Sequence, residues 1–378
     1  MRRFSGYLVS VPVLCMAAVI FIFAACTGTW TPDSKSFVYS SGGNAIMLRD
    51  FANKRSKKLV SLAAPPKGSI FQIGVRDDGK QLAVLRVHGT KENPFVRFRV
   101  FDIAGKPLHT SPDIKLKTEV KLNNEFSRFE FCYWAGTKYL IGIVPQLSCM
   151  ISYEIEKKEH HIFDGMIPLS MLMHEMAPWS SVTPASPDGS KFIAYKENEI
   201  QIVPLPKGEP RAVEIPKSSE KVAIDARAGP GSVRLRGYWE KHTLVFPVNS
   251  VELRIDCKNE SVSIRETERL KRLFEHAKEA KSLLVGQLSK DWVVEAIKEP
   301  GAQGTDSATL RIHNIKTKQD KPIPKVDQVM HIAVTPAPDR KHFLVFAFSQ
   351  SPTFLVLDTE GNVVDRVDNF LGQLPNPQ

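Results

Sequence analysis

The stretch "ASPDGSKFIAYKENEIQIVPL", residues 185–205, contains the pattern that decides the fold. Pro187 restricts the backbone at the start of a turn, and Gly189 supplies the positive φ that a tight Asp-Gly hairpin turn needs. Residues 191–195 are rich in strand formers, and residues 199–205 mostly alternate polar and apolar side chains. The stretch therefore predicts a strand, a tight turn, a second strand, a short loop and a third strand.

The same unit recurs along the chain, most clearly as "TWTPDSKSFVYSSGGNAIMLRD" from residue 29 and "AVTPAPDRKHFLVFAFSQSPTFLVLD" from residue 333. The predicted turn centres are Asp33, Asp78, Gly136, Asp188, Lys241, Lys290 and Asp339. Their spacing of about 45–60 residues suits the four-stranded blades of a propeller, in which neighbouring sheets cover each other. We therefore predict an all-β fold, a single β-propeller of seven four-stranded blades in residues 26–378, with six or eight blades as alternatives.

Two of the turns also support a family resemblance. The phrases "WTPDSKSFVY" and "SPDGSKFIAY" resemble the repeats of TolB-type propellers, which belong to the wider WD-like group. The resemblance covers three of the seven units well and implies the propeller fold. It implies no particular function, because that group includes many unrelated binding proteins and some enzymes.

The first residues, "MRRFSGYLVSVPVLCMAAVIFIFAAC", resemble a bacterial lipoprotein signal peptide in residues 1–25, with Cys26 as the lipid attachment site. Thr27 resembles the residue that follows the cysteine in lipoproteins sorted to an outer membrane. The alternative is an uncleaved membrane anchor, because the apolar run is about long enough to span a bilayer. Both readings predict an extracytoplasmic protein tethered to the cell envelope. The short stretch between Cys26 and Trp30 predicts that the body lies close to the membrane, with the first blade facing it.

The charge and cysteine content restrict the partners that we expect. The chain carries a net charge of +10, and "NKRSKK", residues 53–58, is its densest basic run. We interpret this run as a solvated turn, with a phosphate-rich surface as the alternative. No nucleic-acid-binding motif accompanies it, so we predict no nucleic-acid partner. Among the body's cysteines, Cys132 and Cys149 are predicted two strands apart, too far for a disulfide.

Catalytic and metal-binding motifs are scarce. The sequence has no G-x-S-x-G, H-E-x-x-H or paired C-x-x-C pattern, so we predict no metal and no cofactor. His160 and His161 are adjacent on a predicted strand and point to opposite sides, which does not suit one ion. His174 and Glu175 lie in a methionine-rich segment that we interpret as an interblade loop or short helix. A soft metal site or a flexible ligand surface is the alternative.

One segment breaks the strand pattern. Leu270, Leu273, Phe274, Ala277 and Leu284 follow one helical stripe, which predicts a helical insertion near residues 265–284. Its start is either a capping box formed by Ser263 and Glu266 or an N-cap at Thr267. We expect this helix to connect the fifth and sixth units and to pack on the outside of the ring. A docking helix for a partner is the alternative.

Two functions fit this sequence. The first is a non-catalytic, envelope-tethered propeller that acts as a binding or scaffolding module for a protein, peptide or glycan. The second is an enzyme whose site is assembled at the central channel from several blades; Asp225, Glu240, His331 and Asp339 are the residues to examine. Three or more converging His, Asp or Glu side chains would favour the enzyme.

Overall fold

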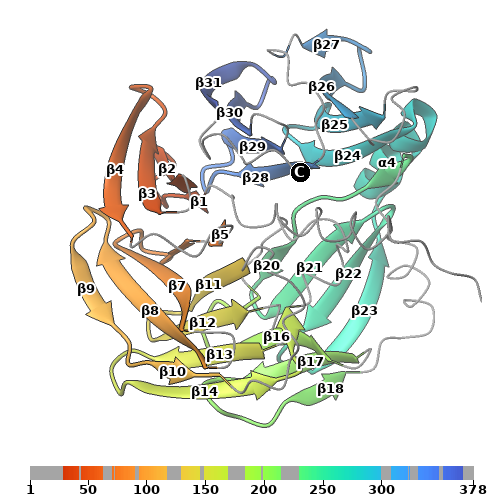
Figure 1. Cartoon of the computed structure of the whole chain (residues 1–378). Helices are drawn as coiled ribbons and strands as arrows, with labels where there is room; N and C mark the ends of the chain where they lie inside the picture. The colour runs from red at the N-terminus through yellow and green to blue at the C-terminus, as the bar shows by residue number, and fades with distance from the viewer. Residues whose placement is uncertain are drawn as a thin grey trace, which may run out of the picture.

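The computed structural model describes residues 29–41, 44–62, 70–71, 73–89, 93–116, 129–144, 149–168, 184–196, 199–213, 230–298, 308–321, 323, 331–348 and 352–368. Within these ranges the strands form seven sheets that follow one another around a central axis (Figure 1). None of the helices in the described ranges is both long and apolar enough to cross a membrane.

The first four blades follow one another from the start of the described chain. Blade 1 contains β1 (Thr29–Trp30), β2 (Ser36–Ser41), β3 (Ala45–Asp50) and β4 (Arg55–Ser61). Blade 2 contains β6 (Gly74–Val75), β7 (Gln81–Gly89), β8 (Pro94–Asp102) and a split outer strand, β9 (Pro107–Thr110) and β10 (Ile114–Lys115). Blade 3 contains β11 (Phe129–Ala135), β12 (Tyr139–Val144), β13 (Cys149–Glu154) and β14 (Glu159–Asp164). Blade 4 contains β15 (Ile167–Pro168), β16 (Lys191–Lys196), β17 (Glu199–Pro204) and β18 (Arg211–Val213).

The last three blades complete the ring. Blade 5 contains β20 (Tyr238–Glu240), β21 (Thr243–Val248), β22 (Val251–Asp256) and β23 (Ser261–Glu266). Blade 6 contains β24 (Ser282–Gln287), β25 (Trp292–Lys298), β26 (Ala308–Asn314) and β27 (Asp320–Lys321). Blade 7 contains β28 (His331–Pro336), β29 (His342–Phe348), β30 (Thr353–Asp358) and β31 (Val363–Asp368). Two short strands, β5 (Ile70–Phe71) and β19 (Ser232–Val233), pair in parallel with the inner strands β11 and β24.

The predicted seven-bladed propeller is confirmed. Each of the seven predicted turn centres lies in the turn between the first and second strands of a different blade. These turns all lie on one face of the ring, because the first strand of every blade runs in the same direction along the axis. We call this the turn face.

The recurring Pro-Asp phrase has a structural cause. In blade 1 the Thr31 hydroxyl donates to the Asp33 carboxylate at 2.7 Å, and in blade 4 Ser186 donates to Asp188 at 2.5 Å. Each aspartate also accepts a backbone N–H two residues later. Gly189 has φ +69°, and a Cβ there would lie 2.7 Å from the Ala135 carbonyl of blade 3. The aspartate thus fixes the turn, and glycine allows two neighbouring turns to touch.

Side chains close the ring, because blades 7 and 1 exchange no strand. The Trp30 indole donates to the Thr335 carbonyl at 3.0 Å. The Arg49 guanidinium forms a bidentate pair with Asp365 at 2.7 and 2.8 Å, and the Asp365 side chain is only 2% exposed. This closure places a buried ion pair at the seam, where many propellers have a shared sheet.

Apolar clusters join neighbouring blades. The largest contains buried side chains from blades 1, 3, 4 and 7, on both sides of the axis, including Trp30, Tyr133, Phe192 and Phe346. Four further clusters join blades 1 and 2, 2 and 3, 4 and 5, and 6 and 7. In the described part of the chain, apolar packing therefore joins most pairs of neighbouring blades.

Three other expectations concern the basic run, the body's cysteines and the methionine-rich segment. The basic run is only partly a turn, because its residues from Arg55 onward form the exposed outer strand β4, where charges oppose edge-to-edge pairing. Cys132 and Cys149 are buried free thiols on β11 and β13, with β12 between them. His174 and Glu175, with the interblade loop or short helix expected there, lie outside the described residues.

Candidate functional site

Blade 5 has one apolar face and one polar face. Polar and apolar side chains alternate in β22 and β23, and the apolar side chains of one face pack against blade 4: Leu244, Phe246, Val248, Leu253, Ile255 and Val262. The opposite face carries the buried Val245 and Pro247 of β21 and, around them, a polar set: Tyr238, Glu240, Thr243, Glu252, Arg254, Asp256, Ser261, Ser263 and Arg265. We call this second set the polar face of blade 5. A propeller blade normally buries both faces, so this surface needs an explanation.

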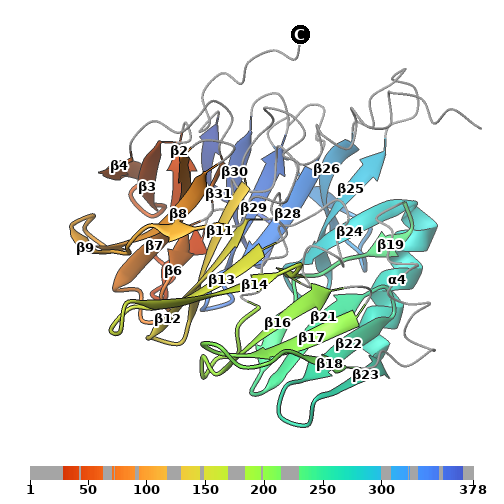
Figure 2. The same cartoon turned by 60° about the horizontal axis from the view of Figure 1, so that its bottom comes forward.

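Helix α4 (Glu268–Ala280) provides the explanation, because it lies between blades 5 and 6. Its N-cap is Thr267, whose hydroxyl accepts the Leu270 N–H at 3.2 Å, and Lys281 ends it in the left-handed conformation. Leu270, Leu273 and Ala277 pack on blade 6 and on the segment that leads into β20. No side chain of β21, β22 or β23 joins this cluster within the described residues. Figure 2 shows the helix beside blades 5 and 6; within the described residues its apolar stripe packs on blade 6 and not on β21, β22 or β23.

The predicted helix is confirmed, with two differences. It is shorter than the predicted range, because residues 265–266 end β23 and residues 282–284 begin β24. The Ser263 capping box is wrong, since Ser263 lies in β23, and the Thr267 alternative is correct. The helix lies at the outer edge of the ring, as expected, with its apolar stripe packed on blade 6 (Figure 1).

A buried carboxylate fixes the helix to blade 6. Glu295 of β25 is fully buried and accepts from Ser282 at 2.5 Å, from His276 of α4 at 3.2 Å and from Arg311 at 2.7 Å. Burial alone would raise the pKa of Glu295. The hydrogen bonds from His276 and Ser282 and the charge of Arg311 outweigh burial and lower this pKa to about 2. The carboxylate therefore stays ionised and holds α4 in place.

A charge network covers the polar face of blade 5. Glu252, with a side chain only 4% exposed, accepts from Arg265 at 2.7 Å and from Arg254 at 3.1 Å. The other end of the Arg254 guanidinium contacts Glu240 at 2.5 Å, and the Glu240 side chain is 43% exposed. One side of the Arg254 guanidinium therefore contacts the buried carboxylate of Glu252, and the other side contacts the more exposed carboxylate of Glu240.

Tyr238 is the one hydroxyl of this network that could suggest catalysis. It donates to Glu252 at 3.3 Å. Burial and the negative charges of Glu252 and Glu240 raise its pKa. A nucleophilic phenol would need the opposite change, so the geometry favours a structural hydrogen bond.

A depression of about 580 Å³ lies at the turn-face end of the polar face. It is lined by Glu240, Lys241, His242, Thr243, Arg254, Asp256 and Lys258. Asp256 accepts the Lys258 and Asn259 backbone N–H groups at 2.8 and 3.0 Å. Burial raises the pKa of Asp256, but these hydrogen bonds outweigh it, and the pKa lies below its usual value. The Asp256 carboxylate thus forms its hydrogen bonds within its own turn.

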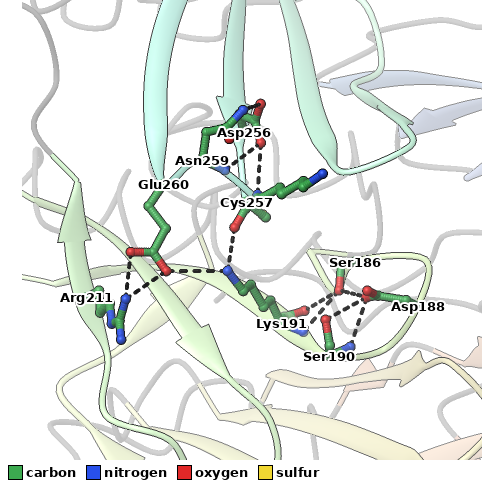
Figure 3. A network of polar contacts seen from close by, with 10 residues as sticks. Ser186, Asp188, Ser190, Lys191, Arg211, Asp256, Cys257, Asn259 and Glu260 are labelled. Carbon is green, nitrogen blue, oxygen red and sulfur yellow. Dashed lines mark hydrogen bonds and ion pairs between the residues drawn. The ribbon is translucent and has the colours of Figure 1, made fainter.

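Contacts with blade 4 hold this turn (Figure 3). The Lys191 amine donates to the Cys257 carbonyl at 2.5 Å and lies 3.4 Å from Glu260. Arg211 of β18 pairs with the same glutamate at 3.0 Å. The depression therefore has a wall that is fixed by two blades.

The four residues proposed for a channel enzyme do not converge in the described contacts. Glu240 lies on the polar face of blade 5, and Asp339 lies in the blade 7 turn, where it accepts the Lys341 N–H at 2.9 Å. His331 begins β28, and Asp225 lies outside the described residues. No group of three or more His, Cys, Asp or Glu side chains within the described ranges could hold a metal ion.

Sequence reasoning missed the polar face of blade 5, although a signal was present. The strands "VELRID" and "SVSIRE" alternate strictly, whereas "YLIGIV" and "CMISYE" of blade 3 are almost entirely buried on both faces. Strict alternation in one blade of a propeller indicates a face that no neighbouring blade covers. No sequence pattern indicated the contact between His276 and Glu295, because the two residues lie in different elements, a helix and a strand.

Comparisons with known proteins add little beyond the fold. No family model and no curated protein matches the chain. Among solved structures, it is similar to "Dihydro-heme d1 dehydrogenase NirN in complex with DHE", with TM-score 0.43, 13% identity, and 91% of this chain and 66% of that chain covered. It is also similar to a chain of the "Mitotic Checkpoint Complex", with TM-score 0.43, 10% identity, and 86% of this chain and 84% of that chain covered. A third similar structure is "The C-Terminal WD40 Domain Of Sif2", with TM-score 0.42, 11% identity, and 89% of this chain and 82% of that chain covered. These similarities say nothing about what this chain binds.

Proposed function

We propose that this protein is an envelope lipoprotein, anchored through Cys26, whose propeller acts as a non-catalytic module that binds a protein partner. The observation that carries the binding role is the polar face of blade 5, which helix α4 keeps apart from blade 6. Its exposed charges and hydroxyl groups lie on a rigid sheet, as a specific docking surface requires. We further propose that the repeats are of the TolB type, because the Thr31 and Ser186 turns share their side-chain contacts.

The start of the chain is consistent with this arrangement. Thr29 pairs with Val38 in blade 1, and β2 continues for three more residues toward the face opposite the turn face. Thr29 is also three positions after Cys26, and an extended chain over three residue steps spans about 10 Å. A lipid on Cys26 would therefore hold the opposite face of the ring against the membrane, rather than the side of one blade.

This orientation would leave the turn face free. The depression of blade 5 lies at that face, since Lys241 and Lys258 belong to turns there. The basic run also begins in a turn of this face, so it would point away from the anchoring membrane. A partner could then reach blade 5 without contacting the lipid surface.

The tether is tested by growth with labelled fatty acid. The wild-type chain is expected to take up label, and the Cys26→Ala variant to lose it. Wild-type protein that carries no label would contradict the lipid anchor. Membrane association with the signal segment retained would then favour the uncleaved anchor.

The binding role is tested by a steric block. Ser263 is exposed on the polar face, so Ser263→Trp should leave the fold intact and reduce recovery of a chemically crosslinked partner about tenfold or more. Leu108→Trp on the exposed strand β9 is the matched control. Equal recovery from both variants would exclude this face as the docking surface.

A further inference from the structure

The depression at the polar face of blade 5 carries an excess of available positive charge. Of its lining carboxylates, Asp256 is held by its own turn and Glu240 by Arg254. Lys241 and Lys258 are exposed, and no carboxylate of the described residues lies within ion-pair distance of either amine. The available charges on this surface are therefore cationic.

Arg254 adds a positioned anchor to these two lysines. Its NH1 group contacts Glu252, which is buried and also bound by Arg265, so this half of the guanidinium is fixed. Its NH2 group contacts Glu240, whose side chain is 43% exposed, far more than that of Glu252. An incoming carboxylate could replace Glu240 without leaving the buried Glu252 unpaired. Arginine presents its N–H groups in a planar fork, which suits this exchange.

We propose that the depression binds an acidic segment of the partner protein, in which one carboxylate displaces Glu240 from Arg254 and others contact Lys241 and Lys258. This inference rests on the proposed binding function and specifies its chemistry. Glu240 then competes with the partner's carboxylate for Arg254 and is paired with Arg254 only in the unbound protein. The buried Glu252 keeps Arg254 in position in both states.

The exchange predicts an unusual result for one substitution. Glu240→Gln removes the competing charge, so it should tighten binding of an acidic ligand about tenfold, the effect of one charge-assisted hydrogen bond. Arg254→Lys should weaken binding about tenfold, because lysine cannot contact Glu252 and a ligand carboxylate in the same planar geometry. A surface that attracts anions only through net charge would not distinguish arginine from lysine.

The probe is a fluorescein-labelled peptide of alternating glutamate and glycine, measured by fluorescence anisotropy at low ionic strength. A peptide with glutamine in place of glutamate is the control ligand. The double variant Lys241→Ala and Lys258→Ala should weaken binding about fivefold to tenfold. Lys57→Ala with Lys58→Ala on the exposed strand β4 removes the same charge elsewhere and should change the affinity less than about twofold.

Several outcomes would overturn the proposal: unchanged or weaker binding by Glu240→Gln, equal binding of the glutamine peptide, or an equal loss in the β4 variant. Displacement of the peptide by polygalacturonate at a lower carboxylate concentration would assign the site to an acidic glycan instead. The Ser263→Trp variant distinguishes failure of the proposed docking surface from failure of the proposed acidic ligand. If that block removes the partner while the acidic peptide fails to bind, the docking surface stands and its proposed chemistry is wrong.

Discussion

Glu295 gives the most quantitative prediction. Its pKa changes from 4.5 in the unfolded chain to about 2 in the folded protein. A folded-state pKa below the unfolded value means that ionisation of Glu295 stabilises the fold above pH 4.5 and that this contribution is lost as the pH falls toward 2. The difference corresponds to about 3 kcal/mol at pH 7. Glu295→Gln should therefore lower the free energy of unfolding by about this amount.

Urea unfolding of the wild type and the variant, followed by circular dichroism from pH 7 downward, measures this difference. It should be largest at neutral pH and should shrink between pH 4.5 and 2. Glu266→Gln is the control, because Glu266 forms an exposed ion pair with Lys271 and should cost less than about 1 kcal/mol. Equal losses for the two variants, or a Glu295→Gln loss that persists in acid, would refute the anchoring role of Glu295.

Two further predictions concern the ring. Asp365→Asn leaves Arg49 without its charged partner at the seam and should lower the free energy of unfolding by about 3 kcal/mol in thermal melts. Asp113→Asn, which breaks an exposed pair with Arg97, is the control and should cost much less. Gly189→Ala should cost about 2 kcal/mol or more, because its Cβ would meet the Ala135 carbonyl at 2.7 Å. Gly165→Ala has a similar positive φ but meets only the flexible Lys196 side chain, so a loss as large as that of Gly189→Ala would contradict the crowding argument.

The repeat was readable from sequence because several blades use the same local chemistry, most clearly blades 1, 4 and 7. A proline, an aspartate that accepts backbone N–H groups and a following strand depend on residues a few positions apart, as the Asp33 and Asp188 turns show. The number of blades followed from counting those turns. The helix was also readable, because its buried stripe is periodic.

The contacts that position the candidate site join residues far apart in the sequence. Arg49 and Asp365 are separated by nearly the whole chain, and nothing near either residue indicates the other. The orientation of α4 depends on Glu295, which reads as an ordinary strand residue until its partners are known. The polar face of blade 5 was visible in its alternation, but its exposure depends on where the helix packs.

The central claim is that blade 5 is the docking surface of this propeller. A photo-reactive amino acid can be placed, one position at a time, in the exposed turn between the third and fourth strands of each blade and irradiated in intact cells. The seven positions are Lys54, Lys106, Lys158, Lys207, Lys258, Lys318 and Glu360. We predict a discrete crosslinked product at Lys258 that disappears when Ser263→Trp is added. Products at another blade and none at Lys258, or a Lys258 product that survives the Ser263→Trp block, would contradict the claim.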